Sequence, residues 1–304
     1  MAAPAIEGIL IIDKPVDWTS HDVVAKMRGI LKTRRIGHTG TLDPFATGVL
    51  VVCVNRATRL VQFLTGHDKE YLATIRLGWR TDSGDLTGQP LGEPADAGEI
   101  SPAQISAALD HFRGRIRQTP PMFSAKKIGG RKLYELAREG REIERAPIEV
   151  TISRLELRSS NPAPPLARDL EIHVTCSAGT YIRTLAEDIG QQLGIGAHLI
   201  ALRRIRAGNC RIEQAITLDE LSEISRSGPL DSHLQGMAET LDLPILTLSD
   251  DSLVAISHGR PLPCADNWRP DQLVSLCDQQ GRLQAVAAYE ADRHHLAPRV
   301  VLTP

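Results

Sequence analysis

The sequence predicts a globular protein of mixed strands and helices, with one large domain followed by a small one. The chain has 304 residues, of which 42% are hydrophobic and 24% charged. That composition is ordinary for a soluble folded protein, and the length is enough for two domains. Short apolar runs typical of buried strands alternate with segments whose apolar residues recur at helical spacing. Pro244 is a reasonable boundary, so we expect domains at residues 1–243 and 244–304.

The totals argue against several classes of protein. The formal net charge is -2, so total charge gives no support to a nucleic-acid binder, and any RNA site must come from local clusters of Lys and Arg. The five cysteines form no C-x-x-C pair, which leaves no zinc signature and no disulfide framework. The sequence has no signal peptide and no apolar run of membrane length. We therefore expect a cytoplasmic protein with no membrane partner.

The first elements surround a glycine-rich loop. Residues 6–12 are typical of a buried strand, and Thr19 and Ser20 offer an N-cap for a helix whose apolar stripe runs to residue 31. The loop GHTGTLDPFATG occupies residues 37–48, and the apolar run at 49–54 predicts a strand after it. Such loops bring backbone close to a ligand, and the ionisable side chains in this one are His38 and Asp43.

Asp43 has two interpretations. Asp before Pro is a good helix start, with Asp43 as the N-cap and Pro44 at the first helical position. Alternatively, the carboxylate serves a function. Both can hold at once, because a cap-like conformation would keep the carboxylate still.

The middle of the chain contains a basic segment. Residues 57–64 predict a short helix, residues 69–78 a half-buried strand, residues 81–88 a turn and residues 101–112 a helix. Seven Lys or Arg and no acid lie between Arg113 and Lys132, with Phe123 and Tyr134 interleaved. This composition suits phosphate contacts with some stacking. A solvated basic surface with both aromatics in the core is the alternative.

Arg183 stands out in the next helix. Strands are predicted at 149–157 and 170–176, followed by a helix with Thr180 as its N-cap. Arg183 would lie in the first turn, where the helix dipole disfavours a cation, and Glu187, four residues on, is in the poorer orientation for pairing. A partner from elsewhere in the chain is plausible, although Arg183 alone could also be a surface residue.

The remaining elements include the small domain. A strand is expected from residue 202 to residue 212 and a helix at 217–224. The small domain should hold a helix at 249–257 and strands at 272–276, 283–289 and 299–302.

At least five ordered motifs between residues 8 and 215 resemble those of the bacterial tRNA pseudouridine-55 synthases. They include DKPVDWTS at 13–20, GHTGTLDPFATG at 37–48, PPMFSAKK at 120–127, GTYIR at 179–183 and GAHLIALRR at 196–204. Asp17 departs from the family's usual Gly, and Asp tolerates a positive φ better than most residues. The resemblance implies an α+β fold: a large mixed, mainly antiparallel sheet flanked by helices, plus a small PUA-type β-barrel.

The resemblance also implies roles for individual residues. Asp43 would be the nucleophile, Arg183 its partner that keeps it ionised, and Tyr71 the tyrosine that packs on the base and offers a hydroxyl for the C5 proton. His38 would help to extrude the base, and Tyr181 and Leu202 would line the pocket. His198 is expected to be structural. The expected RNA contacts are Lys14, Arg35, Phe123, Lys126, Lys127, Arg131 and Lys132.

The implied activity is isomerisation of uridine 55 in the T-loop of tRNA. No cofactor, metal or protein partner is expected, and a monomer that binds the T-arm would suffice. The sequence leaves open whether Asp43 attacks C6 of the base or C1′ of the ribose, or acts mainly as a base on the sugar. The rivals are a guide-RNA-dependent pseudouridylase, an RNA-binding or RNA-folding protein with incidental catalysis, and a phosphate-loop enzyme. The absence of a G-K-[ST] sequence counts against the last.

Overall fold

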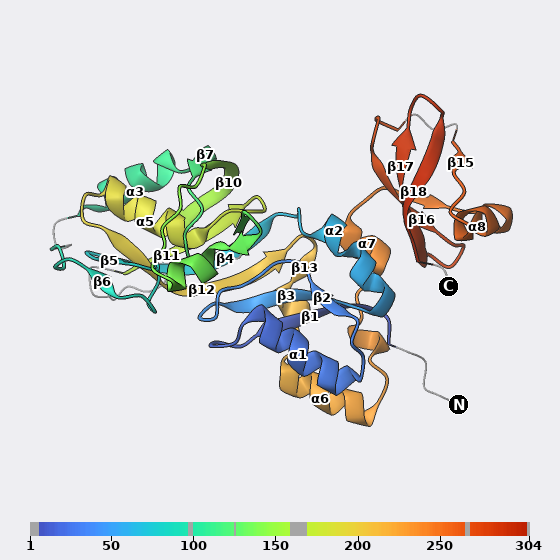
Figure 1. The fold of residues 1–304 in the computed structure, drawn as a ribbon, viewed down its shortest axis with the longest axis horizontal. Helices are drawn as coiled ribbons and strands as arrows, with labels where there is room; N and C mark the ends of the chain where they lie inside the picture. The colour runs from blue at the N-terminus through green and yellow to red at the C-terminus, as the bar shows by residue number, and fades with distance from the viewer. Residues whose placement is uncertain (1–5, 97–99, 125, 159–168, 265–267, 303–304) are drawn as a thin grey trace.

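Two sheets form the framework of the protein (Figure 1). The computed structural model describes residues 6–96, 100–124, 126–158, 169–264 and 268–302. In the large sheet the strand order is β1-β3-β12-β4-β11-β10-β7. Neighbouring strands are antiparallel, except that β3 and β12 are parallel to each other. Its strands are β1 (Gly8–Lys14), β2 (Ile36–His38), β3 (Thr47–Val54), β4 (Lys69–Leu77), β7 (Gly114–Gln118), β10 (Ile148–Leu157), β11 (Asp169–Cys176), β12 (Ala197–Ala207) and β13 (Cys210–Arg211). The expected α+β fold is confirmed.

Helices cover the two halves of the large sheet. α3 (Pro102–His111) and α5 (Ile182–Gln192) lie over the half that holds β4, β10 and β11, and α1 (Ser20–Leu31) and α6 (Leu218–Ser227) lie at the β1 end (Figure 1). α1 and α6 pack on the side chains of Leu10, Ile12, Leu50 and Val52, while Ile9, Ile11, Val49 and Val51 enter a second cluster. Because successive strand residues point to opposite faces, β1 and β3 are buried on both sides.

The helix starts follow the capping residues seen in the sequence. Thr19, Ser101 and Thr217 are N-caps, and each forms a capping box with the residue three positions on. The predicted helix is present as α5, but its predicted N-cap Thr180 is wrong, since the N-cap is Tyr181. Thr180 instead donates its hydroxyl to the Ser177 carbonyl at 2.9 Å.

Other predicted elements differ in extent. No helix follows Asp43: the Ala46 N–H closes one turn on the Asp43 carbonyl at 3.1 Å, and β3 then begins at Thr47. β12 begins at Ala197, earlier than predicted. The predicted helix at 57–64 is the 3₁₀ helix η1 (Asn55–Leu60) and α2 (Val61–Leu64). Asp17 does adopt a positive φ, 65°.

The second sheet contains the predicted C-terminal strands. Its order is β14-β16-β17-β18-β15, made of β14 (Ile245–Thr247), β15 (Leu262–Pro263), β16 (Leu273–Cys277), β17 (Leu283–Glu290) and β18 (His295–Val301). α8 (Asp250–Ser257) packs on it, and α7 (Met237–Leu241) precedes it. Arg56 joins the two parts by donating to the Leu302 carbonyl at 2.7 Å. The boundary at residue 244 stays a prediction.

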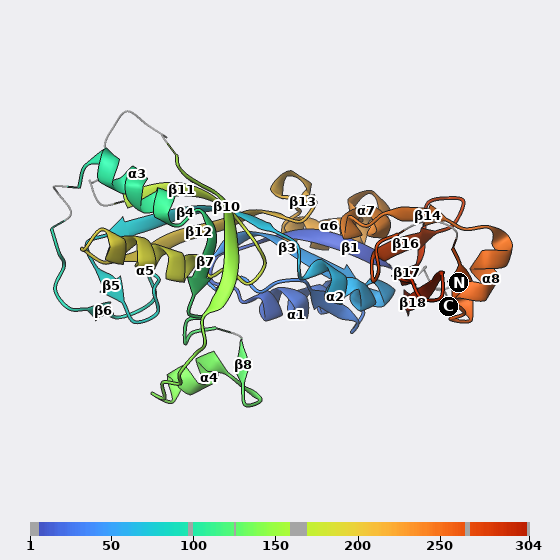
Figure 2. The same cartoon turned by 90° about the horizontal axis from the view of Figure 1, so that it is seen from above.

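Short elements project from the large sheet. The hairpin of β8 (Lys127–Ile128) and β9 (Arg131–Lys132) leads into α4 (Leu133–Arg138), and Figure 2 shows β8 and α4 standing away from the main body. The hairpin of β5 (Arg80–Thr81) and β6 (Pro90–Leu91) lies near α5. Ala125, within the predicted PPMFSAKK motif, lies outside the described residues.

Gly48 and Gly29 should respond oppositely to Ala. Gly48 has φ +98°, and a Cβ there would lie 2.2 Å from the Arg204 carbonyl oxygen. We expect Gly48→Ala to lower the free energy of unfolding by more than about 2 kcal/mol. Gly29 lies within α1 with nothing within 4 Å of a Cβ, so Gly29→Ala should raise it by about 0.5–1 kcal/mol. Urea denaturation of both variants measures this, and equal effects would contradict it.

Candidate active site

A cavity of about 340 Å³ opens beside the glycine-rich loop. Its walls come from that loop, from β4 and β12, and from the start of α5. Asp43, Tyr71, Tyr181, Arg183 and Leu202 all line it. The structure therefore brings together five side chains that were predicted as catalytic or pocket-lining.

Asp43 and Arg183 form a two-point ion pair. The Arg183 Nε lies 2.9 Å from Asp43 Oδ2, and its Nη2 lies 3.0 Å from Oδ1. The Arg183 side chain is 5% exposed, whereas Asp43 is 32% exposed. The predicted pairing is thus present, and the planar guanidinium fixes the orientation of a carboxylate that the cavity can reach.

Arg183 has three further partners. It donates to the carbonyl oxygens of Ser83 at 3.0 Å and Phe123 at 2.6 Å, and its Nη1 lies 3.5 Å from Asp85 Oδ2. Asp85 is buried and was not predicted to belong to the site. These contacts explain how a cation is tolerated in the first turn of α5, where the dipole disfavours it.

The protonation of Asp43 reflects opposing influences. Burial raises the pKa of the Asp43 carboxyl above its ordinary value, the Arg183 guanidinium opposes the rise, and Asp85 adds to it. Arg183 therefore limits the upward shift of the pKa instead of reversing it. The direction of the Arg183 effect agrees with the expectation that this guanidinium favours the ionised form of Asp43.

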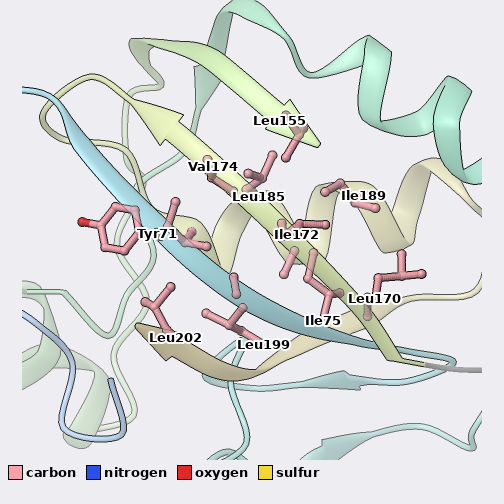
Figure 3. Packing of buried hydrophobic residues seen from close by; sticks show 14 of the residues in the cluster. Tyr71, Ile75, Leu155, Leu170, Ile172, Val174, Leu185, Ile189, Leu199 and Leu202 are labelled. Atoms are coloured by element: carbon pink, nitrogen blue, oxygen red, sulfur yellow. The ribbon is translucent and has the colours of Figure 1, made fainter. Parts of the chain in front are cut away.

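Tyr71 and Leu202 occupy neighbouring strands. Tyr71 lies on β4, and Leu202 on β12 pairs with Ala73 of the same strand. Both side chains are 8% exposed. In Figure 3, Tyr71 lies at the end of the packed cluster with its hydroxyl pointing away from the other labelled side chains. Burial raises the pKa of the Tyr71 hydroxyl and nearby Arg204 opposes the rise, so Tyr71 is a neutral phenol at physiological pH.

Gln118 holds the backbone of Tyr181. Its amide oxygen accepts from the Tyr181 N–H at 3.0 Å, and its amide nitrogen donates to the Tyr181 carbonyl at 3.2 Å. Gln118 is 1% exposed at the end of β7. Sequence reasoning missed it, because a Gln beside a basic segment carries no distinctive signal.

His38 lies next to the cavity. Burial lowers the pKa of His38 to about 4, so its imidazole is neutral at physiological pH. The His38 Nδ1 atom is buried without a hydrogen-bond partner among the described residues. The His38 and His21 rings form an edge-to-face contact, with their centroids 5.5 Å apart. The following residue, Thr39, lines the cavity.

Lys14 requires a correction. It was expected to contact RNA, but it is fully buried. Its ammonium donates to the carbonyl oxygens of Pro15, Trp18 and Pro44 at 2.8, 2.5 and 3.0 Å. Burial also lowers the pKa of Lys14 to about 8. Lys14 therefore supports the turn that carries Asp43 from within.

The other expected RNA contacts lie nearer the surface. Arg35 is exposed, Phe123 is half-buried, and Lys126 lines the cavity. Arg131 is exposed and pairs with Glu139. Lys127 and Lys132 are opposite each other in the β8–β9 hairpin, and their side chains lie outside those described.

Other observations concern structural and ligand-binding groups. His198 is buried, and its Nδ1 lies 2.9 Å from the Trp79 carbonyl oxygen, so its structural role is confirmed. Within the described ranges, no three His, Cys, Asp or Glu side chains are grouped to hold a metal ion. No helix in the described part is long and apolar enough to cross a membrane.

Comparison with known proteins agrees with this geometry. The N-terminal domain of the TruB family pseudouridylate synthases matches residues 28–182, and the C-terminal domain of tRNA pseudouridylate synthase B matches residues 183–242. The tRNA pseudouridine synthase B of Bacillus pumilus is 43% identical over 92% of both chains. That of Heliobacterium modesticaldum is 43% identical over 98% of this chain and 96% of the relative.

Solved structures show the same fold. A chain in the crystal structure of a Cbf5-Nop10-Gar1 complex superposes with a TM-score of 0.76 at 27% identity, covering 98% of this chain and 85% of that chain. A chain in the structure of an H/ACA RNP bound to a substrate RNA containing 2'-deoxyuridine superposes with a TM-score of 0.75 at 26% identity. This match covers 98% of this chain and 85% of that chain. With family models matching residues 28–242 and relatives at 43% identity over nearly the whole chain, this protein belongs to the TruB family of pseudouridylate synthases.

Proposed function

We propose that this chain isomerises uridine to pseudouridine at position 55 in the T-loop of tRNA, with Asp43 as the nucleophile. The observation that carries the proposal is the bidentate pair of the accessible Asp43 carboxylate with buried Arg183, in the cavity that Tyr71 also lines. The names of the 43%-identical bacterial relatives support tRNA as the substrate.

The reaction breaks the C1′–N1 bond and forms a C1′–C5 bond. C5 loses its proton and N1 of the product carries one, so no redox step is needed. Asp43 attacks and is regenerated, and Arg183 holds its carboxylate in one orientation, which favours a near-attack geometry. The Tyr71 ring packs against the base, and its hydroxyl is the candidate to handle the C5 proton. Tyr181 and Leu202 enclose the base in the cavity.

The base must leave its stack before it can react. Extrusion of a stacked base costs a few kcal/mol, which contacts to the RNA backbone offset. The projecting segment from β8 to α4 is suited to such contacts, together with Arg35 and Lys126. Because the Phe123 carbonyl accepts from Arg183 at 2.6 Å, the segment that leads into this projection is joined directly to the catalytic ion pair.

The enzyme is proposed to act alone, as a cytoplasmic monomer without cofactor, metal or guide RNA. The bacterial relatives at 43% identity support this over the Cbf5-containing complexes at 27%. The direct test incubates the purified chain with unmodified tRNA and no additive, then maps pseudouridine. Modification at position 55 is expected, and its absence would contradict the proposal.

Asp43→Asn should abolish catalysis and spare binding. The amide is a poor nucleophile, so the single-turnover rate should fall by more than about a thousandfold. The affinity for tRNA should stay within about threefold, because phosphate contacts dominate it. Filter binding and single-turnover assays on one preparation measure both. Near-normal turnover would contradict the assignment of Asp43.

Arg183→Met and Asp85→Asn should shift the pH profile in opposite directions. The ionised carboxylate is required, so the single-turnover rate falls as the pH drops through the pKa of Asp43. Arg183 lowers that pKa and Asp85 raises it. The acid limb should therefore move to higher pH in Arg183→Met and to lower pH in Asp85→Asn. Arg183→Met should also lose about a hundredfold or more in rate at its optimum, since the carboxylate is no longer oriented.

These two variants control for each other. Each disrupts a contact of a buried charge, so each should lower the melting temperature. A loss of stability alone would reduce activity without moving the acid limb. Acid limbs that move in the same direction, or not at all, would contradict the electrostatic account of the site.

Activity should persist in EDTA. The reaction has no redox change, and the proposed nucleophile and proton acceptor are side chains of this chain. Single-turnover rates in excess EDTA should match those without it, once monovalent salt keeps the tRNA folded. Loss of activity on folded tRNA, restored by one particular divalent ion, would be the contrary result.

A further inference from the structure

Two buried cations border the active-site cavity without taking part in the Asp43–Arg183 pair. Lys69 begins β4 and is 8% exposed, and Arg204 on β12 is 2% exposed. Both line the cavity. Tyr71 lies two residues after Lys69, on the same face of β4. Arg204 on β12 is directly opposite Tyr71 in the pairing of the two strands. The two cations therefore lie on the same face of the sheet as the proposed active-site tyrosine.

The two side chains meet beside Gly40. A Cβ built on Gly40 would lie 3.6 Å from Arg204 Nη1 and 3.9 Å from Lys69 Cε. The proximity also acts on charge: burial, together with Arg204, lowers the pKa of Lys69 to about 8. The structure thus holds two like charges close together at a buried position.

Neutral groups surround this pair of charges. Lys69 Nζ donates to the carbonyl oxygens of Thr65 and His67 at 2.7 and 2.5 Å. Arg204 donates to those of Val49 and Gly40 at 2.7 and 3.1 Å. Within the described ranges, no carboxylate forms an ion pair with either residue. Asp68, the residue before Lys69, favours the charged form but does not prevent the lowering of the Lys69 pKa.

Such an arrangement is costly in the free protein. Burial disfavours each charge, and the proximity of two like charges adds to the cost. An anion that enters the cavity would offset both penalties by pairing with the two cations. The cavity wall also carries the hydroxyl groups of Thr39 and Thr41, which can donate to anionic oxygens.

The position of Lys69 indicates which anion fits. Its ammonium binds the carbonyl of Thr65, and Thr65 and Thr41 are exposed residues of the cavity wall. This part of the wall therefore lies at the mouth. A nucleotide that enters base first, towards Asp43, leaves its phosphate at the mouth.

We propose that Lys69 and Arg204 form a binding site for one phosphodiester at or beside the nucleotide that enters the cavity. The site rests on the proposed function, because it needs an RNA substrate. It is separate from the basic projection between β8 and α4, which would contact the RNA outside the cavity. Lys69 is here a positioning residue: it holds the backbone while Asp43 and Tyr71 act on the sugar and base.

The experiment combines a change in the protein with a change in the RNA. The protein is wild type or Lys69→Met. The RNA is an unmodified T-arm hairpin with all phosphates charged, or with one neutral methylphosphonate at one of the three phosphates nearest the target uridine. Lys26→Met, which removes the same charge from an exposed position on α1, is the matched control. Affinity is measured across salt concentrations, and single-turnover rate at saturating RNA.

The proposal predicts coupling at one phosphate. Lys69→Met should weaken binding of the charged hairpin about tenfold and reduce the slope of log K against log salt by about one. When the methylphosphonate replaces the contacted phosphate, the affinity of wild type should fall by a similar factor relative to the charged hairpin. The affinity of Lys69→Met should then fall little further, because the variant has already lost this contact. Lys26→Met should show no such coupling at any of the three positions.

Three results would overturn the site. Equal losses of affinity for every hairpin in Lys69→Met, with a lowered melting temperature, would mean that Lys69 only fastens the Thr65 and His67 carbonyls. A loss of single-turnover rate with unchanged affinity and salt slope would place the Lys69 charge on the reacting base. Wild type that neither binds nor modifies the charged hairpin would contradict the proposed function as well, whereas the first two results would leave that function intact.

Discussion

The burial of the Arg183 guanidinium is the constraint on which the active site depends. A cation that is 5% exposed and lies in the first turn of a helix is unfavourable by itself. Its compensation comes from three other segments: the Asp43 loop, the Ser83–Asp85 turn and the Phe123 carbonyl. These segments must converge for the chain to fold stably. The contacts that satisfy this buried charge therefore also assemble the cavity of the proposed active site.

Other buried polar groups make the geometry specific. Lys14 joins three carbonyls around the Asp43 turn, and Gln118 fixes the Tyr181 backbone ahead of α5. Each would be costly to leave unsatisfied, so each restricts the turn or loop that it holds to one conformation. Asp43, the proposed nucleophile, and Tyr181 thus lie on backbone that buried side chains hold in place, although both lie outside regular secondary structure.

The sequence predicted the elements that a local residue pattern determines. It predicted few of the contacts between residues that are distant in the chain. Apolar periodicity and capping residues located α1, α3 and α6, and the dipole argument showed that Arg183 needed a distant partner. Lys14 was misassigned because a lysine normally indicates a surface, and its Pro44 partner lies 30 residues away. Asp85 and Gln118 were not predicted either, because their partners Arg183 and Tyr181 lie far away in the sequence. β7 was not predicted, because its sequence GRIRQ lacks the alternation of apolar and polar residues that marks a half-buried strand. It is an edge strand, and its two arginines are exposed.

Local charge also explains why the net charge of -2 says little about RNA binding. At physiological salt the Debye length is about 8 Å, so acids on distant surfaces are largely screened from a bound phosphate. Charges inside the cavity are screened much less. There, Asp43 and Asp85 both lie against Arg183, whereas Lys69 and Arg204 have no carboxylate partner among the described residues. The interior therefore divides into a part in which two carboxylates lie against Arg183, and a part in which Lys69 and Arg204 leave an excess of positive charge.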